Sequence, residues 1–129
     1  MIGIQFIPKK FREKQESKHL IVLNEQGLRL LKRACFDCHS YETQWPWYSY
    51  VAPISWLVER DVRMARARLN FSEWEDLGKS RKKKLAEKII KSIETKSMPL
   101  WNYSLLHPEA KLEKSEQDII FESLRIFLP

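Results

Sequence analysis

Residues 24–39, NEQGLRLLKRACFDCH, determine the expected fold of this chain. Leu28, Leu31 and Cys35 follow one another at spacings of three and four residues, which is the period of one face of an α-helix. Asn24 has a side chain that commonly caps a helix N-terminus. The stretch therefore predicts one helix that ends near Cys38 and His39 and carries both cysteines of the chain.

The remainder of the chain continues this helical pattern. Further helices are predicted at about residues 55–69, 80–96 and 115–127, the first capped by Ser55 and the last by a signature of Ser115 and Asp118. Trp56, Val62 and Leu69 are expected to point inward from the first of these helices. A capping box, SEWE at residues 72–75, predicts a short turn. Prolines make residues 40–53 and 97–109 loops, so the prediction is all-α with two long, aromatic-rich loops.

Composition limits the classes of function. The 129 residues, of which 43% are hydrophobic, suit one domain, predicted at residues 24–129 after an arm at residues 1–23. Three glycines exclude Gly-rich phosphate loops. The net charge of +6 is compatible with an acidic protein, a membrane surface or a nucleic acid as partner. Nucleic acid is disfavoured, because the aromatic residues gather near the cysteines while the basic run SRKKKLAEK, residues 80–88, lies elsewhere.

The pattern Cys35-Phe36-Asp37-Cys38-His39 is the chain's strongest chemical signal. Cysteines three residues apart near a helix end can reach two vinyl-derived carbons on one edge of a haem, and the following histidine can reach the iron. The alternatives are half of a zinc site or a redox dithiol. A structural zinc site needs four ligands, and no spaced His or Cys pair completes this one. No strand pattern precedes Cys35, as a thioredoxin-like dithiol would require.

The opposite face of the iron needs its own ligand, and four residues are candidates. Met98 is favoured because it leaves a predicted helix just before Pro99, which suits the presentation of a ligand better than core packing. His107 is the alternative sixth ligand. Met64, inside a predicted helix, is interpreted as core filler, and His19 as a solvated surface residue.

A family resemblance follows from these motifs. The order of helix, CxxCH, loop, helices, Met-Pro loop and terminal helix resembles a class I cytochrome c, with Gly27 placed where a C-terminal helix crosses closely and Leu31 as the large apolar residue. A closer resemblance is to the small bacterial haem-binding domain family, over about residues 24–127. It rests on the motifs CHS-x-x-T-x-x-PWY, AP-x-SW, LNFSEW, MP and HPEAKL.

The resemblance implies a cytochrome c-like helical domain that carries one covalent haem c and is secreted or anchored to a membrane. Cys35 and Cys38 correspond to the thioether residues, His39 to the proximal ligand and Met98 to the methionine of the MP motif. Pro53 is the candidate whose carbonyl orients the proximal imidazole, although Ala52 stands where cytochromes c usually have glycine.

Aromatic residues follow the cysteines closely and recur near Met98. Trp47, Trp56 and Trp101 are expected to wall the haem, together with Trp45, Tyr48 and Tyr50, the alternative being ordinary core packing.

These observations predict a monomeric one-electron carrier in an extracytoplasmic redox chain, not itself an enzyme. A haem sensor or peroxidase-like protein with a labile sixth ligand is the alternative, and a zinc or dithiol module ranks last. The apolar start IGIQFIP predicts the outer end of an inner-membrane anchor that begins upstream of Met1. The basic run at residues 80–88 could dock an acidic redox partner or anionic lipid, although a solvated helix face is favoured.

Overall fold

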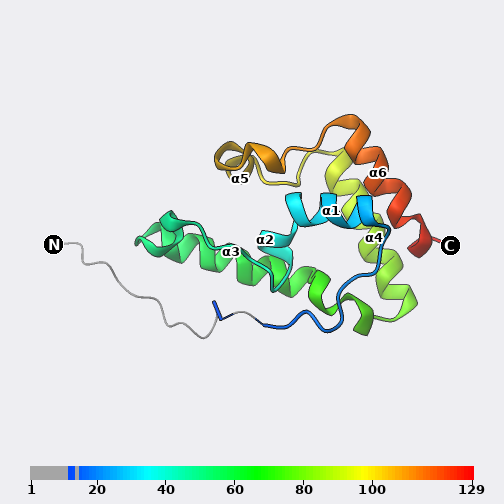
Figure 1. Ribbon diagram of the computed structural model, residues 1–129, viewed down its shortest axis with the longest axis horizontal. Helices are drawn as coiled ribbons and strands as arrows, with labels where there is room; N and C mark the ends of the chain where they lie inside the picture. The colour runs from blue at the N-terminus through cyan, green and yellow to red at the C-terminus, as the bar shows by residue number, and fades with distance from the viewer. Residues whose placement is uncertain (1–11, 14) are drawn as a thin grey trace.

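The computed structural model describes residues 12–13 and 15–129, and within these residues the chain forms helices and no strands (Figure 1). The all-α prediction is therefore confirmed. The α-helices are α1 (Glu25–Ala34), α2 (Phe36–His39), α3 (Ile54–Arg68), α4 (Lys79–Glu94), α5 (Trp101–Leu106) and α6 (Lys114–Leu124). Short 3₁₀ helices connect or extend them: η2 (Trp47–Tyr50), η3 (Phe71–Asp76), η4 (Pro108–Ala110) and η5 (Arg125–Phe127).

The helix predicted over residues 24–39 is two helices. Asn24 does cap α1, since its Oδ1 accepts a hydrogen bond from the Gly27 N–H at 2.8 Å. The chain leaves helical geometry at Cys35, where φ is −127°. Cys35 both ends α1 and begins α2, because its carbonyl accepts the N–H of His39 at 3.0 Å. This break turns the residues from Cys35 to His39 away from the axis of α1.

Other predicted helix starts were displaced by a few residues. Ser55 does not cap α3, which begins at Ile54 after Pro53, and Ser55 is buried in the first turn. Asn70 rather than Ser72 caps η3. No side chain caps the first turn of α3, whereas in η3 the Asn70 side chain accepts the N–H of Ser72 at 3.0 Å.

The later helices show the same effect. A capping box between Glu113 and Glu116 starts α6 in place of the predicted pair at Ser115 and Asp118. The proline-broken loop after Met98 contains the unpredicted helix α5.

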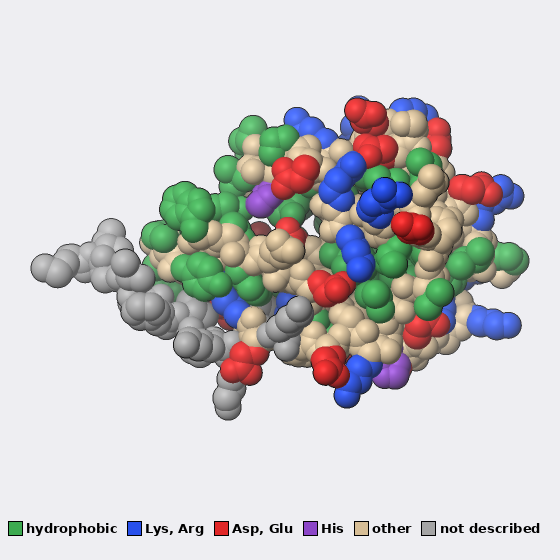
Figure 2. Space-filling view, viewed as in Figure 1, with side chains coloured by type: hydrophobic (Ala, Val, Ile, Leu, Met, Phe, Trp, Pro, Cys, Tyr) green, Lys and Arg blue, Asp and Glu red, His purple; other side chains and the backbone are tan. Residues whose placement is uncertain are grey.

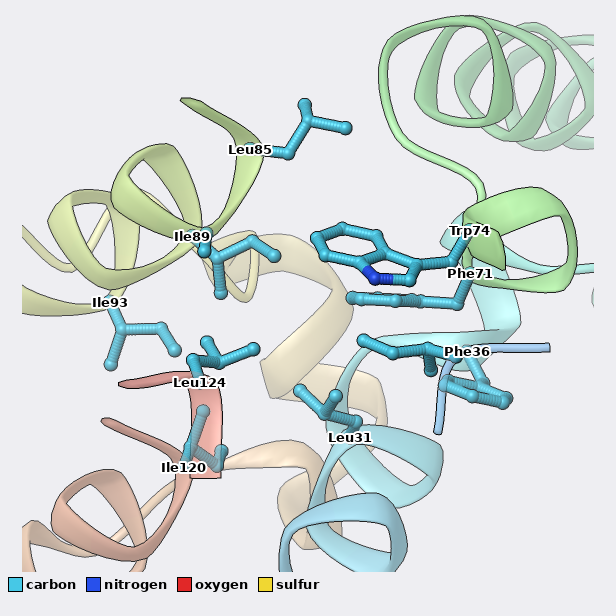
Figure 3. Packing of buried hydrophobic residues seen from close by; sticks show 11 residues of the cluster. Leu31, Phe36, Phe71, Trp74, Leu85, Ile89, Ile93, Ile120 and Leu124 are labelled. Carbon is cyan, nitrogen blue, oxygen red and sulfur yellow. The ribbon is translucent and has the colours of Figure 1, made fainter. Parts of the chain in front are cut away.

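The core lies between α1, α4, α6 and η3 (Figure 3). Phe71 stacks between Phe36 and Trp74, with ring centroids 5.3 and 6.0 Å away, so this aromatic stack joins the cysteine-bearing segment to η3. Ile89 of α4 and Leu124 of α6 face the stack from the other side. Because Phe36 lies between the two cysteines, the core fixes the position of the whole motif.

Helices α1 and α6 cross closely at Gly27. A Cβ atom added there would lie 2.2 Å from Oγ and 2.6 Å from Cβ of Ser123, distances that no side chain could occupy. Ser123 Oγ also lies 3.1 Å from Asn24 Oδ1, so it joins the cap of α1. The crossing expected from the cytochrome c resemblance is therefore present at this glycine.

The described part of the predicted arm packs on the domain. Ile21 is 1% exposed and belongs to the core, and its N–H donates to the carbonyl of Phe71 at 2.9 Å. Arg12 reaches the Ser49 carbonyl at 2.6 Å. Residues 1–11, which include the predicted anchor remnant, lie outside the described residues. From Gln15 to Pro129, no helix has the length and apolar character that crossing a bilayer requires.

Candidate functional site

A cavity of about 820 Å³ opens between α2, α3, α4 and the chain that joins α4 to α5. Its volume falls in the range typical of cofactor sites. Cys35, Cys38, His39 and Met98 all line it, so the structure brings together the four residues that the sequence singled out. Much of the remaining wall is apolar, with Leu69 and Phe71 on one side and Leu85 and Ile89 of α4 on another.

His39 is held by the C-terminal end of α3. Its Nδ1 lies 3.0 Å from the carbonyl oxygen of Leu69 and 3.2 Å from that of Ala65. Carbonyl oxygens only accept hydrogen bonds, so Nδ1 is protonated and its N–H donates to them. Burial lowers the pKa of His39, outweighing these two bonds, and keeps the ring neutral. A neutral imidazole with Nδ1 protonated has its lone pair on Nε2, which is the form that binds a metal.

Pro53 does not orient this ring. The orienting carbonyls belong to Leu69 and Ala65, and Pro53 is an exposed residue at the start of α3. The prediction was wrong because α3 places its opposite end, rather than its beginning, beside the imidazole.

The two cysteines are free thiols in a largely buried position. Burial, together with the neighbouring Cys38, raises the pKa of Cys35 to about 12. Burial, followed by the charges of Asp37 and Asp61, raises the pKa of Cys38 to about 11. Both thiols therefore stay protonated at neutral pH. Dithiol exchange proceeds through a thiolate, so this environment disfavours the redox dithiol. Among the described residues, no three His, Cys, Asp or Glu side chains are grouped to hold a metal ion.

Two methionines, rather than one, line the cavity. Met98 lies on the chain that follows α4, with 38% of its surface exposed, and Met64 lies on α3, with 48% exposed. The interpretation of Met64 as core filler is wrong, because its side chain faces the cavity and solvent. Met64 adjoins Ala65, whose carbonyl contacts His39, whereas Met98 comes from a different wall.

His107 is not among the residues that line the cavity. Its Nε2 bonds to the Tyr48 hydroxyl at 2.7 Å, its Nδ1 lies 3.1 Å from a Glu109 carboxylate oxygen, and its ring stacks on Tyr103. Both nitrogens are thus engaged, and the structure does not support His107 as a sixth ligand. His19 pairs with Asp76 at 3.0 Å on the surface, as expected of a solvated histidine.

The model of one protein family, described as a haem-binding domain, matches residues 1–125. This match covers nearly the entire chain. The protein belongs to the haem-binding domain family. No match was found among curated proteins or among solved structures.

The cavity fits the haem that membership of this family implies. Haem needs an apolar cleft and a neutral imidazole with a free nitrogen. The cavity supplies the apolar wall, and His39 supplies the imidazole in the required tautomer. Cys35 and Cys38 line the same space.

Tyr103 is a cavity residue that was not predicted from the sequence. Its hydroxyl donates to Asp37 Oδ2 at 2.6 Å, and its ring lines the cavity. Burial, followed by the bond to Asp37, raises the pKa of Tyr103 well above its usual range, so the hydroxyl remains a donor. Asp37 also accepts the Gln44 N–H at 3.0 Å. The signal available in the sequence was a carboxylate between the two cysteines, which needs a partner when it is partly buried.

The tryptophans expected to wall the haem do not line the cavity. Trp47 and Trp101 are each 79% exposed and Trp56 is 56% exposed. They belong to η2, α5 and α3, and hydrophobic side chains gather at the end of the molecule that carries α5 and the start of α3 (Figure 2). Trp74, which was not proposed for the haem, is fully buried in the core. Nearness in sequence, to the cysteines for Trp47 and to Met98 for Trp101, misled the prediction, because η2 and α5 leave these side chains exposed to solvent.

Proposed function

We propose that this haem-binding domain is a monohaem c-type cytochrome that carries single electrons outside the cytoplasm. The observation that supports the proposal best is the convergence of Cys35, Cys38 and a pre-oriented His39 on one cavity. When bound, haem supplies the one-electron couple. The chain supplies attachment, an axial nitrogen and a largely apolar wall.

Each residue of the motif has a distinct role in this proposal. Cys35 and Cys38, kept as neutral thiols by burial, form the thioether bonds. His39 binds the iron through Nε2. The carbonyls of Ala65 and Leu69 make this nitrogen a stronger donor to iron, because they accept hydrogen bonds from the Nδ1–H group. Met98 is the proposed sixth ligand, since it reaches the cavity from a wall other than the one that holds His39.

Covalent attachment can be tested directly. The protein is expressed with and without a bacterial cytochrome c maturation system, denatured, and examined by mass spectrometry and absorption. We expect haem to remain with the wild-type chain, to remain through one bond in Cys35→Ala or Cys38→Ala, and to be released from the double variant. Haem that binds the native wild type but separates on denaturation would show haem binding without c-type attachment.

The sixth ligand is tested with two matched variants, Met98→Ala and Met64→Ala. Both remove a methionine that lines the cavity and is partly exposed. If Met98 binds the iron, only its loss removes the ferric methionine-to-iron charge-transfer band and lowers the reduction potential. The reverse pattern would assign the ligand to Met64.

A haem sensor or peroxidase-like protein is the second candidate. The exposure of Met98 supports it, because solvent and small ligands can reach a side chain that is 38% exposed. Carbon monoxide added to the reduced protein discriminates between the two functions. A six-coordinate carrier binds it slowly and incompletely, whereas a sensor with a labile ligand binds it readily at stoichiometric concentrations.

The proposed location and partners follow from the same chemistry. Haem is attached to CxxCH after export in bacteria, which supports a periplasmic protein held at the inner membrane. A redox protein with an acidic docking face is the expected partner, consistent with the net charge of +6. Fractionation of cells that produce the natural gene product tests this location, and recovery in the cytoplasm would contradict it.

A further inference from the structure

Four cationic side chains line the part of the cavity formed by the end of α3 and by α4. They are Arg68 of α3 and Arg81, Lys88 and Lys91 of α4, called here the basic rim. On α4, Arg81 and Lys88 are spaced with Leu85 and Ser92 along one helix face, so two of the five cations of the basic run line the cavity. Both side chains are exposed, in keeping with the solvated helix face favoured from the sequence, and they also border the cavity.

The basic rim has no anionic partner within the described protein. No hydrogen bond or ion pair joins any of its four side chains to a residue in 12–13 or 15–129. Neighbouring cations differ, since Lys82 pairs with Glu75 at 3.2 Å and Arg66 donates to the Ser40 carbonyl at 2.8 Å. An apolar cavity bordered by unpaired cations favours a ligand that carries negative charge at that border.

Acidic groups of the cavity lie on the cysteine side. Asp37 stands between the cysteines, and Asp37 and Asp61 are the charges that act on Cys38. Arg66 is the cation that acts on Cys38. The basic rim instead comes from Arg68, the last residue of α3, and from α4, which carries none of the motif residues.

Haem has a matching asymmetry. Its vinyl groups lie on one half of the porphyrin and its two propionate carboxylates on the other. If Cys35 and Cys38 hold the vinyl half, the propionates extend away from the cysteines. We propose that the basic rim binds the haem propionates, an inference that rests on haem occupying this cavity. Arginine suits a carboxylate because its guanidinium donates two parallel hydrogen bonds, and lysine reaches it from an exposed position along its flexible stem.

The proposal predicts how the rim tunes the haem. Cations beside the propionates keep these groups ionised and favour the reduced iron, which has one positive charge fewer. Removing one cation therefore favours the ferric state. We expect the redox equilibrium to shift by about three- to tenfold for each variant at low salt, where tenfold corresponds to about 59 mV for one electron.

The test compares haem-loaded Arg68→Gln, Arg81→Gln, Lys88→Gln and Lys91→Gln with Lys84→Gln. Lys84 lies exposed on α4 and does not line the cavity, so its variant removes the same charge from the same helix. Reduction potentials are measured from pH 5 to 9. We expect at least two rim variants to lower the potential and to move its pH-dependent step upward, because a propionate without its cation has a higher pKa. Lys84→Gln should change the equilibrium less than twofold.

A second measurement removes the carboxylates instead of the cations. The haem-free protein is titrated with ferric haem and with its dimethyl ester, which has no propionate charge. Arg81→Gln combined with Lys88→Gln should weaken haem binding at least tenfold and leave binding of the ester unchanged. Rim variants that match Lys84→Gln in both measurements, with haem bound normally, would overturn the propionate assignment alone. A wild-type protein that binds no haem would overturn the haem function itself.

Discussion

Gly27→Ala should loosen the crossing of α1 and α6 and thereby destabilise the helix that carries Cys35. The added methyl would stand 2.2 Å from Ser123 Oγ and 2.6 Å from Ser123 Cβ, where ordinary contacts are about 3.5–4 Å. Rotation of the Ser123 side chain can move Oγ but not Cβ. The backbone of one helix must therefore move by roughly 1 Å at this point.

The size of the effect comes from three contributions. Overpacking typically costs about 1–3 kcal/mol. The methyl also lies 3.1 Å from Asn24 Oδ1, and weakening that cap costs about 1 kcal/mol. Alanine returns up to about 1 kcal/mol through its helix propensity. We expect a net loss of about 1–3 kcal/mol in the free energy of unfolding, or about a 5- to 150-fold increase in the unfolded fraction.

Urea denaturation of the haem-free protein, followed by circular dichroism, measures this change. Gly78→Ala is the matched control, because a Cβ at Gly78 meets nothing within 4 Å, and it should cost below about 1 kcal/mol. Ser123→Gly removes both clashing atoms, so adding it to Gly27→Ala should recover at least about 1 kcal/mol relative to the sum of the single changes. Equal stabilities for Gly27→Ala and Gly78→Ala, with no coupling to Ser123, would refute the close-crossing argument.

Three other outcomes follow from the site. Tyr103→Phe removes the hydrogen bond to Asp37 and should lower the free energy of unfolding by about 1.5–3 kcal/mol in urea denaturation. An unchanged urea midpoint would show that this hydrogen bond does not stabilise the fold. In the haem-free protein at pH 8, the raised pKa values should slow alkylation of Cys35 about 1000-fold and of Cys38 about 100-fold relative to a free thiol, as mass spectrometry can follow. The pKa of His39 is lower in the folded than in the unfolded chain, so as the pH falls past about 6.5 the imidazole is protonated in the unfolded chain before it is protonated in the folded one. The free energy of unfolding should therefore drop between pH 7.5 and 5. His39→Gln should abolish the loss of stability that protonation of His39 causes. A variant whose stability depends on pH as the wild type's does would show that His39 is not responsible for this loss.

Haem as the ligand was predictable because the motif that favours it is local. Cys35, Cys38 and His39 favour haem once a zinc site and a redox dithiol are weighed against it, and the all-α pattern follows from the apolar period. The close crossing at Gly27 was also anticipated, since it depends on a residue without a side chain. The propionate assignment could not come from the sequence, because periodicity does not show which face of α4 a cavity meets.

Local patterns in the sequence are enough to show that this protein is helical, that its two thiols and an imidazole form one group, and that haem is the ligand that suits them. The groups that surround this ligand depend on how the helices pack. It placed the carbonyls of Leu69 and Ala65, rather than Pro53, against His39. It also placed the predicted tryptophans outside the cavity. The physical reason is range: capping, periodicity and ligand spacing act over a few residues, whereas a cavity wall is made by helices that are distant in sequence and meet only through packing of the core.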